Sequence, residues 1–172
     1  MPLTRADLLA RLSAFGIEAP TFDHQAVFTV EESEDLHQRI PGAHSKNLFL
    51  KDKKDRVFLV SVLADATVDL KTIHTRIGAQ GRVSFGKPEL LMELLGVAPG
   101  SVTPFGIVND AEGRVTVVLD AGLMAHEVLN FHPLENTATT SIKRDDLVRV
   151  LTDAGHPPQI IAVTQEALAA GL

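Results

Sequence analysis

The sequence predicts a mixed α/β fold, with a largely antiparallel sheet and helices packed around it. Its 172 residues are 45% hydrophobic and 22% charged, which is typical of one globular domain with a full-sized core. Stretches with apolar residues at helical spacing alternate with short apolar runs joined by polar turns. No internal repeat or low-complexity linker divides the chain, so we expect a single domain over residues 1–172.

Two helices and one short extended segment are expected near the N-terminus. Thr4-Arg5-Ala6-Asp7 resembles a capping box with Asp in the usual place of Glu, and apolar residues at helical spacing continue from it to Gly16. Residues 22–28 are expected to be extended. A second, acid-rich helix is expected from Thr29 to just before Pro41.

The middle of the chain predicts a β-hairpin followed by two helices. Apolar runs at 46–51 and 56–63 flank a short polar turn, which is the pattern of paired antiparallel strands. A helix over 69–78 ends at a glycine, and a second helix over 88–96 begins with Pro88 and ends at another glycine. A short strand over 82–85 separates them.

The last third of the chain is expected to be rich in strands. Residues 105–109 and 114–119 flank an Asp-Ala-Glu-Gly turn, which predicts a second hairpin. A helix is expected over 143–154 because apolar residues recur on one face before Gly155. Further strands are expected over 127–132, 137–142 and 160–163.

Composition excludes several classes of protein. The chain has no Cys, so disulfides and thiolate chemistry are excluded. No apolar run approaches the roughly 20 residues that span a bilayer, and the N-terminus lacks the apolar core of a signal peptide. A cytoplasmic protein without a membrane partner is therefore expected.

The charge distribution is uneven. The net charge is -6, which argues against non-specific nucleic-acid binding. Residues 46–87 nevertheless hold nine Lys or Arg against four Asp or Glu, and the rest of the chain holds seven against eighteen. Such a basic segment fits a local contact with an anionic partner, or the ordinary solvation of a hairpin and a helix.

The common catalytic motifs are absent. There is no Gly-x-Ser-x-Gly elbow, no phosphate-binding loop and no dinucleotide fingerprint. His126 and His132 are six residues apart, a spacing that does not place two metal ligands together. No metal or other cofactor is therefore expected, and any chemistry must rest on positioning and electrostatics.

Three segments are candidates for that chemistry. The first segment is His44-Ser45-Lys46-Asn47-Leu48-Phe49-Leu50, in which Lys46 starts a strand. Its side chain either places its own ammonium charge at the edge of a cleft or simply reaches solvent. The Gly- and Pro-rich residues 96–106 could aim backbone N–H groups at one oxygen, or merely connect a helix to a strand. In the third segment, residues 130–140, His132 precedes Pro133 and could orient water near neutral pH.

In this order and spacing, the three segments resemble the YbaK/ProX family of free-standing relatives of the editing domain in bacterial prolyl-tRNA synthetases. The resemblance runs from about Ala26 to Val163. It implies a mixed fold with a curved central sheet. It also implies a metal-independent hydrolase that cleaves the ester between a wrong amino acid and the 3′ end of tRNA(Pro), with the tRNA 2′-hydroxyl assisting.

The resemblance also implies roles for individual residues. Lys46 would grip the terminal adenosine phosphate or the acyl group, with Asn47 hydrogen-bonding nearby, and His132 would hold water or the ribose hydroxyl. The family's substrate loop maps onto Gly100, Ser101, Val102, Thr103, Pro104, Phe105 and Gly106, and Phe28, Val102 and Phe131 are expected to line the amino-acid pocket.

The substrate and the partners are expectations of the same kind. Residues 104–109 and 131–133 are more similar to the alanine-removing branch than to the cysteine-removing one, so the acceptor end of alanyl-tRNA(Pro) is the expected ligand. Prolyl-tRNA synthetase or an elongation factor is a further expected partner. The alternatives are editing of cysteinyl-tRNA(Pro), a non-catalytic nucleic-acid-binding module, and a small-molecule or protein-interaction domain on the same fold.

Overall fold

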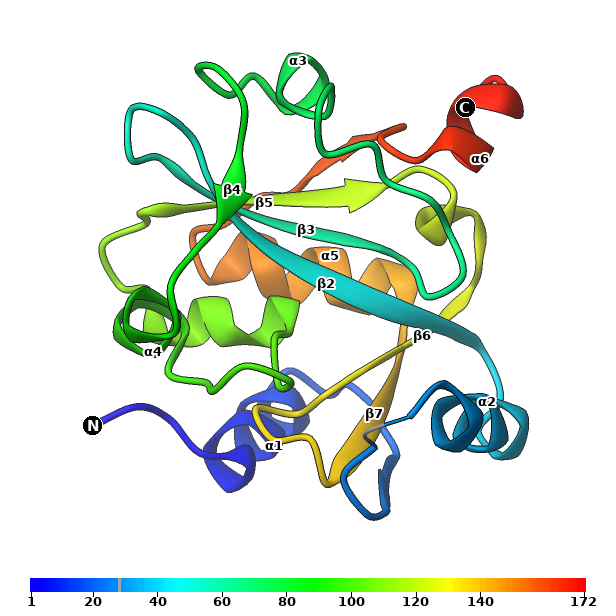
Figure 1. Cartoon of the computed structure of the whole chain (residues 1–172). Helices are drawn as coiled ribbons and strands as arrows, with labels where there is room; N and C mark the ends of the chain where they lie inside the picture. Colours follow the sequence, from blue (N-terminus) through cyan, green and yellow to red (C-terminus); the bar gives the residue numbers. More distant parts are fainter. Residues whose placement is uncertain (28) are drawn as a thin grey trace.

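A single eight-stranded mixed sheet organises the molecule (Figure 1). The computed structural model describes residues 1–27 and 29–172, so the expected pocket residue Phe28 lies outside the described residues. The helices are α1 (Arg5–Ala14), α2 (Val30–Arg39), α3 (His74–Ile77), α4 (Pro88–Leu95), α5 (Arg144–Asp153) and α6 (Gln165–Ala169), with 3-10 helices η1 (Pro104–Asn109) and η2 (Leu123–Ala125). The strands are β1 (Thr21–Asp23), β2 (Ala43–Lys51), β3 (Val57–Leu63), β4 (Ser84–Phe85), β5 (Val115–Asp120), β6 (Val128–Phe131), β7 (Ala138–Lys143) and β8 (Gln159–Ile161).

The strand order is β1-β7-β6-β2-β3-β5-β8, and β4 pairs with the end of β2. Among the described residues, four strand pairs are antiparallel, namely β1–β7, β6–β7, β2–β3 and β2–β4. Three pairs are parallel, namely β2–β6, β3–β5 and β5–β8. The predicted mixed, mainly antiparallel sheet with surrounding helices is confirmed.

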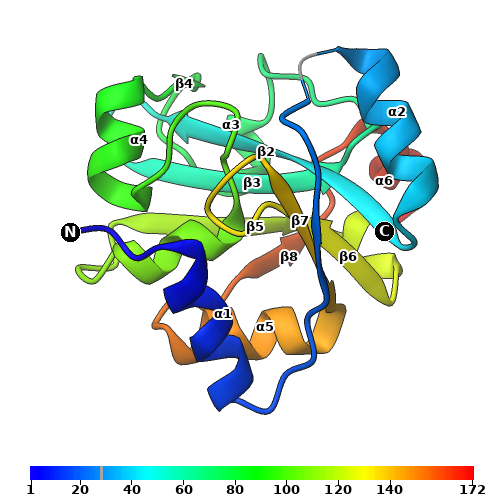
Figure 2. The ribbon, with the colours of Figure 1, turned by 90° about the horizontal axis from the view of Figure 1, so that it is seen from below.

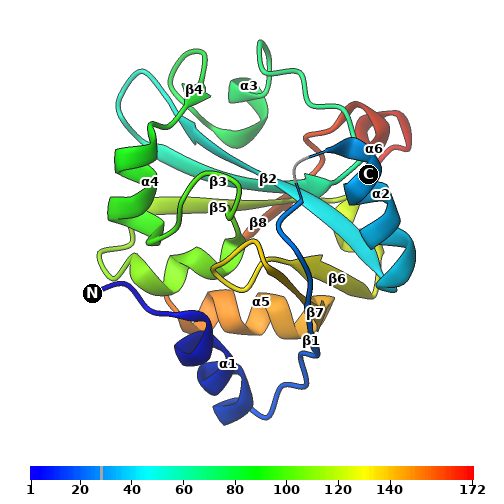
Figure 3. The ribbon, with the colours of Figure 1, turned by 60° about the horizontal axis from the view of Figure 1, so that its bottom comes forward.

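Helices cover both faces of the sheet. Figures 2 and 3 place α1 and α5 on one side of β2 and β3, and Figure 3 places α3 on the other. Helix α4 contributes Leu91, Leu94 and Leu95 to the same core as α1 and α5. The larger apolar core lies under the first group and contains Leu8, Leu95, Phe105 and Leu147. A smaller core on the opposite face gathers residues from β2, β3 and the α3 region, including Leu50, Val60, Ile73 and Ile77.

Local signals placed several elements correctly. Thr4 and Asp7 form the predicted capping box, in which the Thr4 N–H donates to Asp7 Oδ2 over 2.8 Å. Helix α4 begins at Pro88 and ends at Gly96, whose φ of +67° is the left-handed conformation that glycine adopts most easily. The predicted β2–β3 hairpin and helix α5 are also confirmed.

The second predicted hairpin is wrong. Residues 104–109 form the 3-10 helix η1, in which Thr103 Oγ1 accepts the Phe105 N–H over 3.3 Å and Pro104 takes the first position. Strand β5 instead pairs in parallel with β3. Residues 104–107 are all buried, and a short apolar run that is buried all round carries no periodicity to separate helix from strand.

Two further elements differ in length from the prediction, and one helix was missed. The extended segment forms strand only at Thr21–Asp23, and the helix expected over 69–78 is regular only at His74–Ile77 because turns precede it. Helix α6 was not predicted at all.

The two parts of the sheet meet at the start of β2. There β2 pairs in parallel with β6 at only two positions, Ala43 with Leu129 and His44 with Asn130. Two residues beyond His44 the chain reaches Lys46, and two residues beyond Asn130 it reaches His132. Because this parallel pairing stops at His44 and Asn130, the sheet opens between Lys46, which is inside β2 and still pairs with β3, and His132, which directly follows β6.

Candidate functional site

A cleft of about 450 Å3 lies where β2 and β6 separate, with α2 forming one wall. It brings together the first and third candidate segments of the sequence. Its lining residues are Val27, Ser33, Glu34, Leu36, His37, His44, Ser45, Lys46, Asn47, Ala64, Asp65, Asn130, Phe131, His132 and Thr139.

Lys46 lies at this cleft with a fixed side chain. The residue is half-buried, and its Nζ donates a hydrogen bond to the backbone carbonyl oxygen of Ala66 over 2.5 Å. Alternation along β2 places Lys46 on the face of the sheet that Leu48 and Leu50 share; Leu50 belongs to the smaller core and Leu48 packs against it. The ammonium group is therefore held in place instead of moving freely in solvent.

Asn47 points to the opposite face and forms part of a polar chain. Ser61 Oγ donates to Asn47 Oδ1 over 2.5 Å, and Asn47 Nδ2 donates to Ser45 Oγ over 3.4 Å. Ser45 Oγ in turn donates to the Asn130 carbonyl oxygen over 2.8 Å, which connects β2 to β6.

Asn130 fixes the turn that leads into β2. Its Nδ2 donates to the carbonyl oxygens of Pro41 and Ala43, and its Oδ1 accepts from Ser141 Oγ. Gly42 has φ of +101°, and a Cβ there would lie 2.9 Å from Asn130 Nδ2. Glycine is thus required for the close approach, and a fully satisfied polar network holds the start of β2 rigidly.

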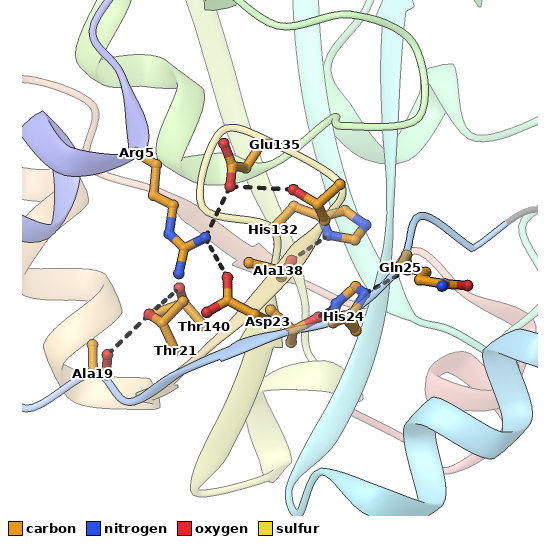
Figure 4. A network of polar contacts seen from close by, with 12 residues as sticks. Arg5, Ala19, Thr21, Asp23, His24, Gln25, His132, Glu135, Ala138 and Thr140 are labelled. Carbon is orange, nitrogen blue, oxygen red and sulfur yellow. Dashed lines mark hydrogen bonds and ion pairs between the residues drawn. The ribbon is translucent and has the colours of Figure 1, made fainter.

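The protonation of His132 follows from its contacts. Its Nδ1 lies 3.0 Å from the Ala138 carbonyl oxygen, which can only accept, so Nδ1 carries a proton (Figure 4). Burial lowers the pKa of the His132 imidazole below its usual value, although the Ala138 hydrogen bond opposes this, and nearby His24 lowers it further. Near neutral pH the ring is therefore uncharged, with an unprotonated Nε2 that can accept a hydrogen bond.

His24, the residue directly after β1, lies next to His132. The two ring centroids are 6.5 Å apart. His24 Nδ1 donates to the Gln25 carbonyl oxygen, and its Nε2 lies 2.8 Å from Thr139 Oγ1 on β7. These contacts tie the segment after β1 to the strand behind His132.

Arg5 joins α1 to both segments that flank His132. Its Nη1 lies 2.6 Å from Asp23 Oδ1 and 2.9 Å from Glu135 Oε1 (Figure 4). The hydrogen bond from Arg5 lowers the pKa of the Asp23 carboxyl group. Leu134, next to Glu135, has a φ of +69°, an unfavourable conformation for a branched side chain, so this loop is held by its surroundings.

A pair of stacked histidines was missed by the sequence reasoning. The rings of His37 on α2 and His44 on β2 are 4.1 Å apart and inclined by 20°, and both line the cleft. His44 Nε2 donates to the Ile40 carbonyl oxygen. Burial lowers the pKa of His37, and His44 adds to this effect. The Pro41-Gly42 turn between them was the available signal, since it returns the chain directly from α2 to β2.

The Gly- and Pro-rich loop does not line the described cleft. The N–H groups of Ser101 and Gly106 donate to the carbonyl oxygens of Ala98 and Thr103, and the N–H of Phe105 donates to Thr103 Oγ1. These donors are already used, so they do not converge on a substrate oxygen. Gly100 lies beside the 132–137 loop, where a Cβ would be 3.6 Å from Asn136 Nδ2.

Two phenylalanines that the sequence analysis named, Phe105 and Phe131, pack against each other in the core. Phe105 is fully buried, and its ring packs edge-on against Phe131 with centroids 5.9 Å apart. Phe131 borders the cleft but is only 2% exposed. Ser101, Thr103 and Pro104 are also buried, while Val102 is half-buried and packs against the larger core.

Among residues 1–27 and 29–172, no cluster of three or more His, Asp or Glu side chains is arranged to hold a metal ion. No described helix has the length and apolar character needed to span a bilayer.

Comparison with known families fits this site. The model of the aminoacyl-tRNA editing domain matches residues 24–150, which include every residue that lines the cleft. The chain belongs to this family. The editing domain thus contains Lys46, His132 and the stacked histidines, while α1 and α6 lie outside the matched range.

Relatives of the editing domain span nearly the same length. The chain is 38% identical over 161 residues to prolyl-tRNA synthetase associated domain-containing protein 1 of Bos taurus, covering 91% of this chain and 94% of the relative. It is 33% identical over 150 residues to the prolyl-tRNA editing protein ProX of Acetoanaerobium sticklandii, covering 87% and 91%. A crystal structure of a candidate trans-editing enzyme for prolyl-tRNA synthetase superposes with a TM-score of 0.70 at 20% identity, covering 96% and 99%.

Proposed function

We propose that this editing domain is a trans-acting deacylase that hydrolyses the ester of mischarged tRNA(Pro), with alanyl-tRNA(Pro) as its substrate. One observation carries the proposal: Lys46 and a neutral His132 line one cleft, and each lies two residues beyond the point where β2 and β6 stop pairing with each other. The names of the relatives support the choice of tRNA.

Lys46 and His132 would have different roles in the hydrolysis. An aminoacyl ester is already activated, so placing one water molecule supplies much of the required catalysis. His132 Nε2 is an acceptor that holds the attacking water or the adjacent ribose hydroxyl. The fixed Lys46 ammonium places positive charge beside the terminal phosphate or the developing oxyanion.

The reaction needs no external co-reactant. The water oxygen forms a bond to the carbonyl carbon, the bond from that carbon to the ribose oxygen breaks, and the ribose oxygen takes up a proton. The products are the free amino acid and intact tRNA. No protein nucleophile and no metal ion is required in this scheme.

Selection of alanine would depend on cleft size. The correct product, prolyl-tRNA(Pro), differs from the substrate only in its amino acid, and attraction alone distinguishes a methylene by only about 1–3 kcal/mol. Exclusion of the larger proline ring by the walls is the stronger filter. Leu36 and Val27 provide apolar wall atoms at the cleft.

The test is a deacylation panel with purified protein. Alanyl-, cysteinyl- and prolyl-tRNA(Pro) are each incubated with the protein, with and without a chelator. Rapid loss of the alanyl ester alone, unchanged by the chelator, is expected. Preferential loss of the cysteinyl ester would reassign the substrate, and tRNA binding without turnover would indicate a non-catalytic module.

A further inference from the structure

Helix α6 is anchored firmly to the end of β5, although it lies outside the range that the family model matches. Asp120 is fully buried at that strand end. Its Oδ1 accepts the Val163 N–H over 2.7 Å, and its Oδ2 accepts the hydroxyl of Thr164, the N-cap of α6, over 2.9 Å. A buried carboxylate with these partners fixes the start of the helix.

The first turn of α6 holds Thr67 by two hydrogen bonds. The Thr67 N–H donates to Glu166 Oε2 over 2.8 Å, and the Gln165 N–H donates to the Thr67 carbonyl oxygen over 2.9 Å. Both backbone groups of Thr67 are therefore engaged by α6. The segment 64–67, which follows β3, cannot shift without breaking these contacts.

This segment carries the acceptor for Lys46. Ala66 directly precedes Thr67, is 4% exposed, and receives the Lys46 Nζ hydrogen bond on its carbonyl oxygen. At the other end of the segment, the Ala64 N–H donates to the His44 carbonyl oxygen over 2.9 Å. The position of the ammonium group thus depends on β2 at one end and on α6 at the other.

The charges are consistent with this geometry. The Thr67 N–H is the main cause of the lowered pKa of the Glu166 carboxyl group, and Lys46 contributes as a nearby positive charge. Glu166 therefore stays ionised near neutral pH, and the positive charge of Lys46 acts on it.

We propose that Glu166 is a positioning residue for Lys46, acting through Thr67 and the Ala66 carbonyl oxygen. The inference rests on the proposed function, in which Lys46 acts on the ester. Glu166 does not touch the substrate in this scheme. Through Glu166, helix α6 would help to fix the position of the Lys46 ammonium group in the editing site.

The test compares Glu166→Ala with Glu166→Gln, using Gln165→Ala as the matched control. Gln165 is the exposed neighbour on the same turn and contacts Thr67 only through its backbone N–H, so its side chain is expendable. We expect Glu166→Ala to lower the single-turnover deacylation rate about tenfold, the scale of a small misplacement of a catalytic group. Glu166→Gln keeps an oxygen acceptor and should recover to within about threefold of the unsubstituted protein.

Combination with Lys46→Ala separates positioning from general stability. If Glu166 acts through Lys46, adding Glu166→Ala to Lys46→Ala should change the rate less than about twofold. A full additional tenfold loss in the double variant would overturn the inference, as would a normal rate in Glu166→Ala.

An activity-free readout keeps this inference separate from the proposed function. The ε-methylene NMR signal of Lys46, assigned by its loss in Lys46→Ala, should shift in Glu166→Ala and stay in place in Gln165→Ala. An unmoved signal overturns the inference. A shifted signal in a protein that lacks deacylase activity overturns the proposed function alone.

Discussion

The His132 Nδ1 atom lies 3.0 Å from the carbonyl oxygen of Ala138, six residues further along the chain. The contact spans the turn between β6 and β7 and decides which ring nitrogen carries the proton. With Nδ1 as the donor, the neutral ring offers Nε2 as an acceptor. The chemistry proposed for the cleft follows from this single hydrogen bond.

The first prediction concerns the pH dependence of deacylation. Because burial lowers the His132 pKa, the neutral acceptor form persists below pH 6.5, and activity should fall on acidification with a midpoint below that value. In His132→Asn this acid limb should disappear and the rate should be lower at every pH by about 10²–10⁴-fold, the contribution of a positioned general base.

The measurement is a pH–rate profile of deacylation for the unsubstituted protein and for His132→Asn. Burial also lowers the pKa of His37, which lines the same cleft, so the comparison with His132→Asn is essential. An acid limb that is unchanged in His132→Asn would assign it to another group.

The second prediction concerns selectivity against proline. Leu36 on α2 lines the cleft and is 7% exposed. Leu36→Ala enlarges the cleft, so the ratio of prolyl- to alanyl-ester hydrolysis should rise by about tenfold or more, the scale of steric discrimination between substrates that differ by one or two carbon atoms. Rates on the two esters, measured side by side, give this ratio directly.

Leu12→Ala is the matched control for this prediction. It removes the same atoms from a buried leucine on α1 that does not line the cleft. A rise of the ratio in both variants would point to general loosening instead of cleft size. Phe131→Ala is a poor choice, because its ring packs against Phe105 and its loss would cost about 3–5 kcal/mol of stability.

The sequence predicted elements that local chemistry defines. The Thr4 capping box, the Pro88 start and Gly96 end of α4, and the β2–β3 hairpin all depend on residues close in the chain. The strand predicted at residues 105–109 was wrong because the buried residues 104–107 have no exposed polar face that would show a helical or strand period. Helix α6 has only five residues, and its start depends on Asp120, which lies more than forty positions earlier.

The candidate site was predictable only in part. Lys46, Asn47 and His132 were singled out, and the structure places all three on one cleft, although their roles remain predictions. The loop over 100–106 was expected there too, but its side chains serve the core and several of its N–H groups serve its own turns. The stacking of His37 on His44 could not be predicted, because it depends on how α2 packs against the start of β2 in the folded chain.

The third prediction concerns a buried hydrogen-bonded pair, His156 and Asp110, away from the cleft. His156 Nε2 lies 2.8 Å from Asp110 Oδ2 and its Nδ1 lies 3.1 Å from the Ala154 carbonyl oxygen, so both nitrogens face acceptors. The two side chains are only 3% and 2% exposed. His156→Ala leaves buried Asp110 Oδ2 with the Val115 N–H but without the imidazole, and the lost buried hydrogen bond should cost about 1–3 kcal/mol of stability.

Chemical denaturation measures this loss as a lowered midpoint with an unchanged slope. His126→Ala, at an exposed histidine, should stay within about 0.5 kcal/mol of the unsubstituted protein. Equal stability of the two variants would show that the His156–Asp110 pair does not stabilise the fold.

The most direct test of the central claim is single-turnover deacylation of alanyl-tRNA(Pro) by the unsubstituted protein, Lys46→Ala and Lys54→Ala. Lys54 lies in the exposed β2–β3 turn, far along the hairpin from the cleft, and serves as the matched control. The expected result is rapid hydrolysis by the unsubstituted protein and by Lys54→Ala, and a rate about 10–10³-fold lower for Lys46→Ala, the scale of losing one placed electrostatic group. A folded Lys46→Ala protein with the normal rate, or an unsubstituted protein no faster than buffer, would contradict the account.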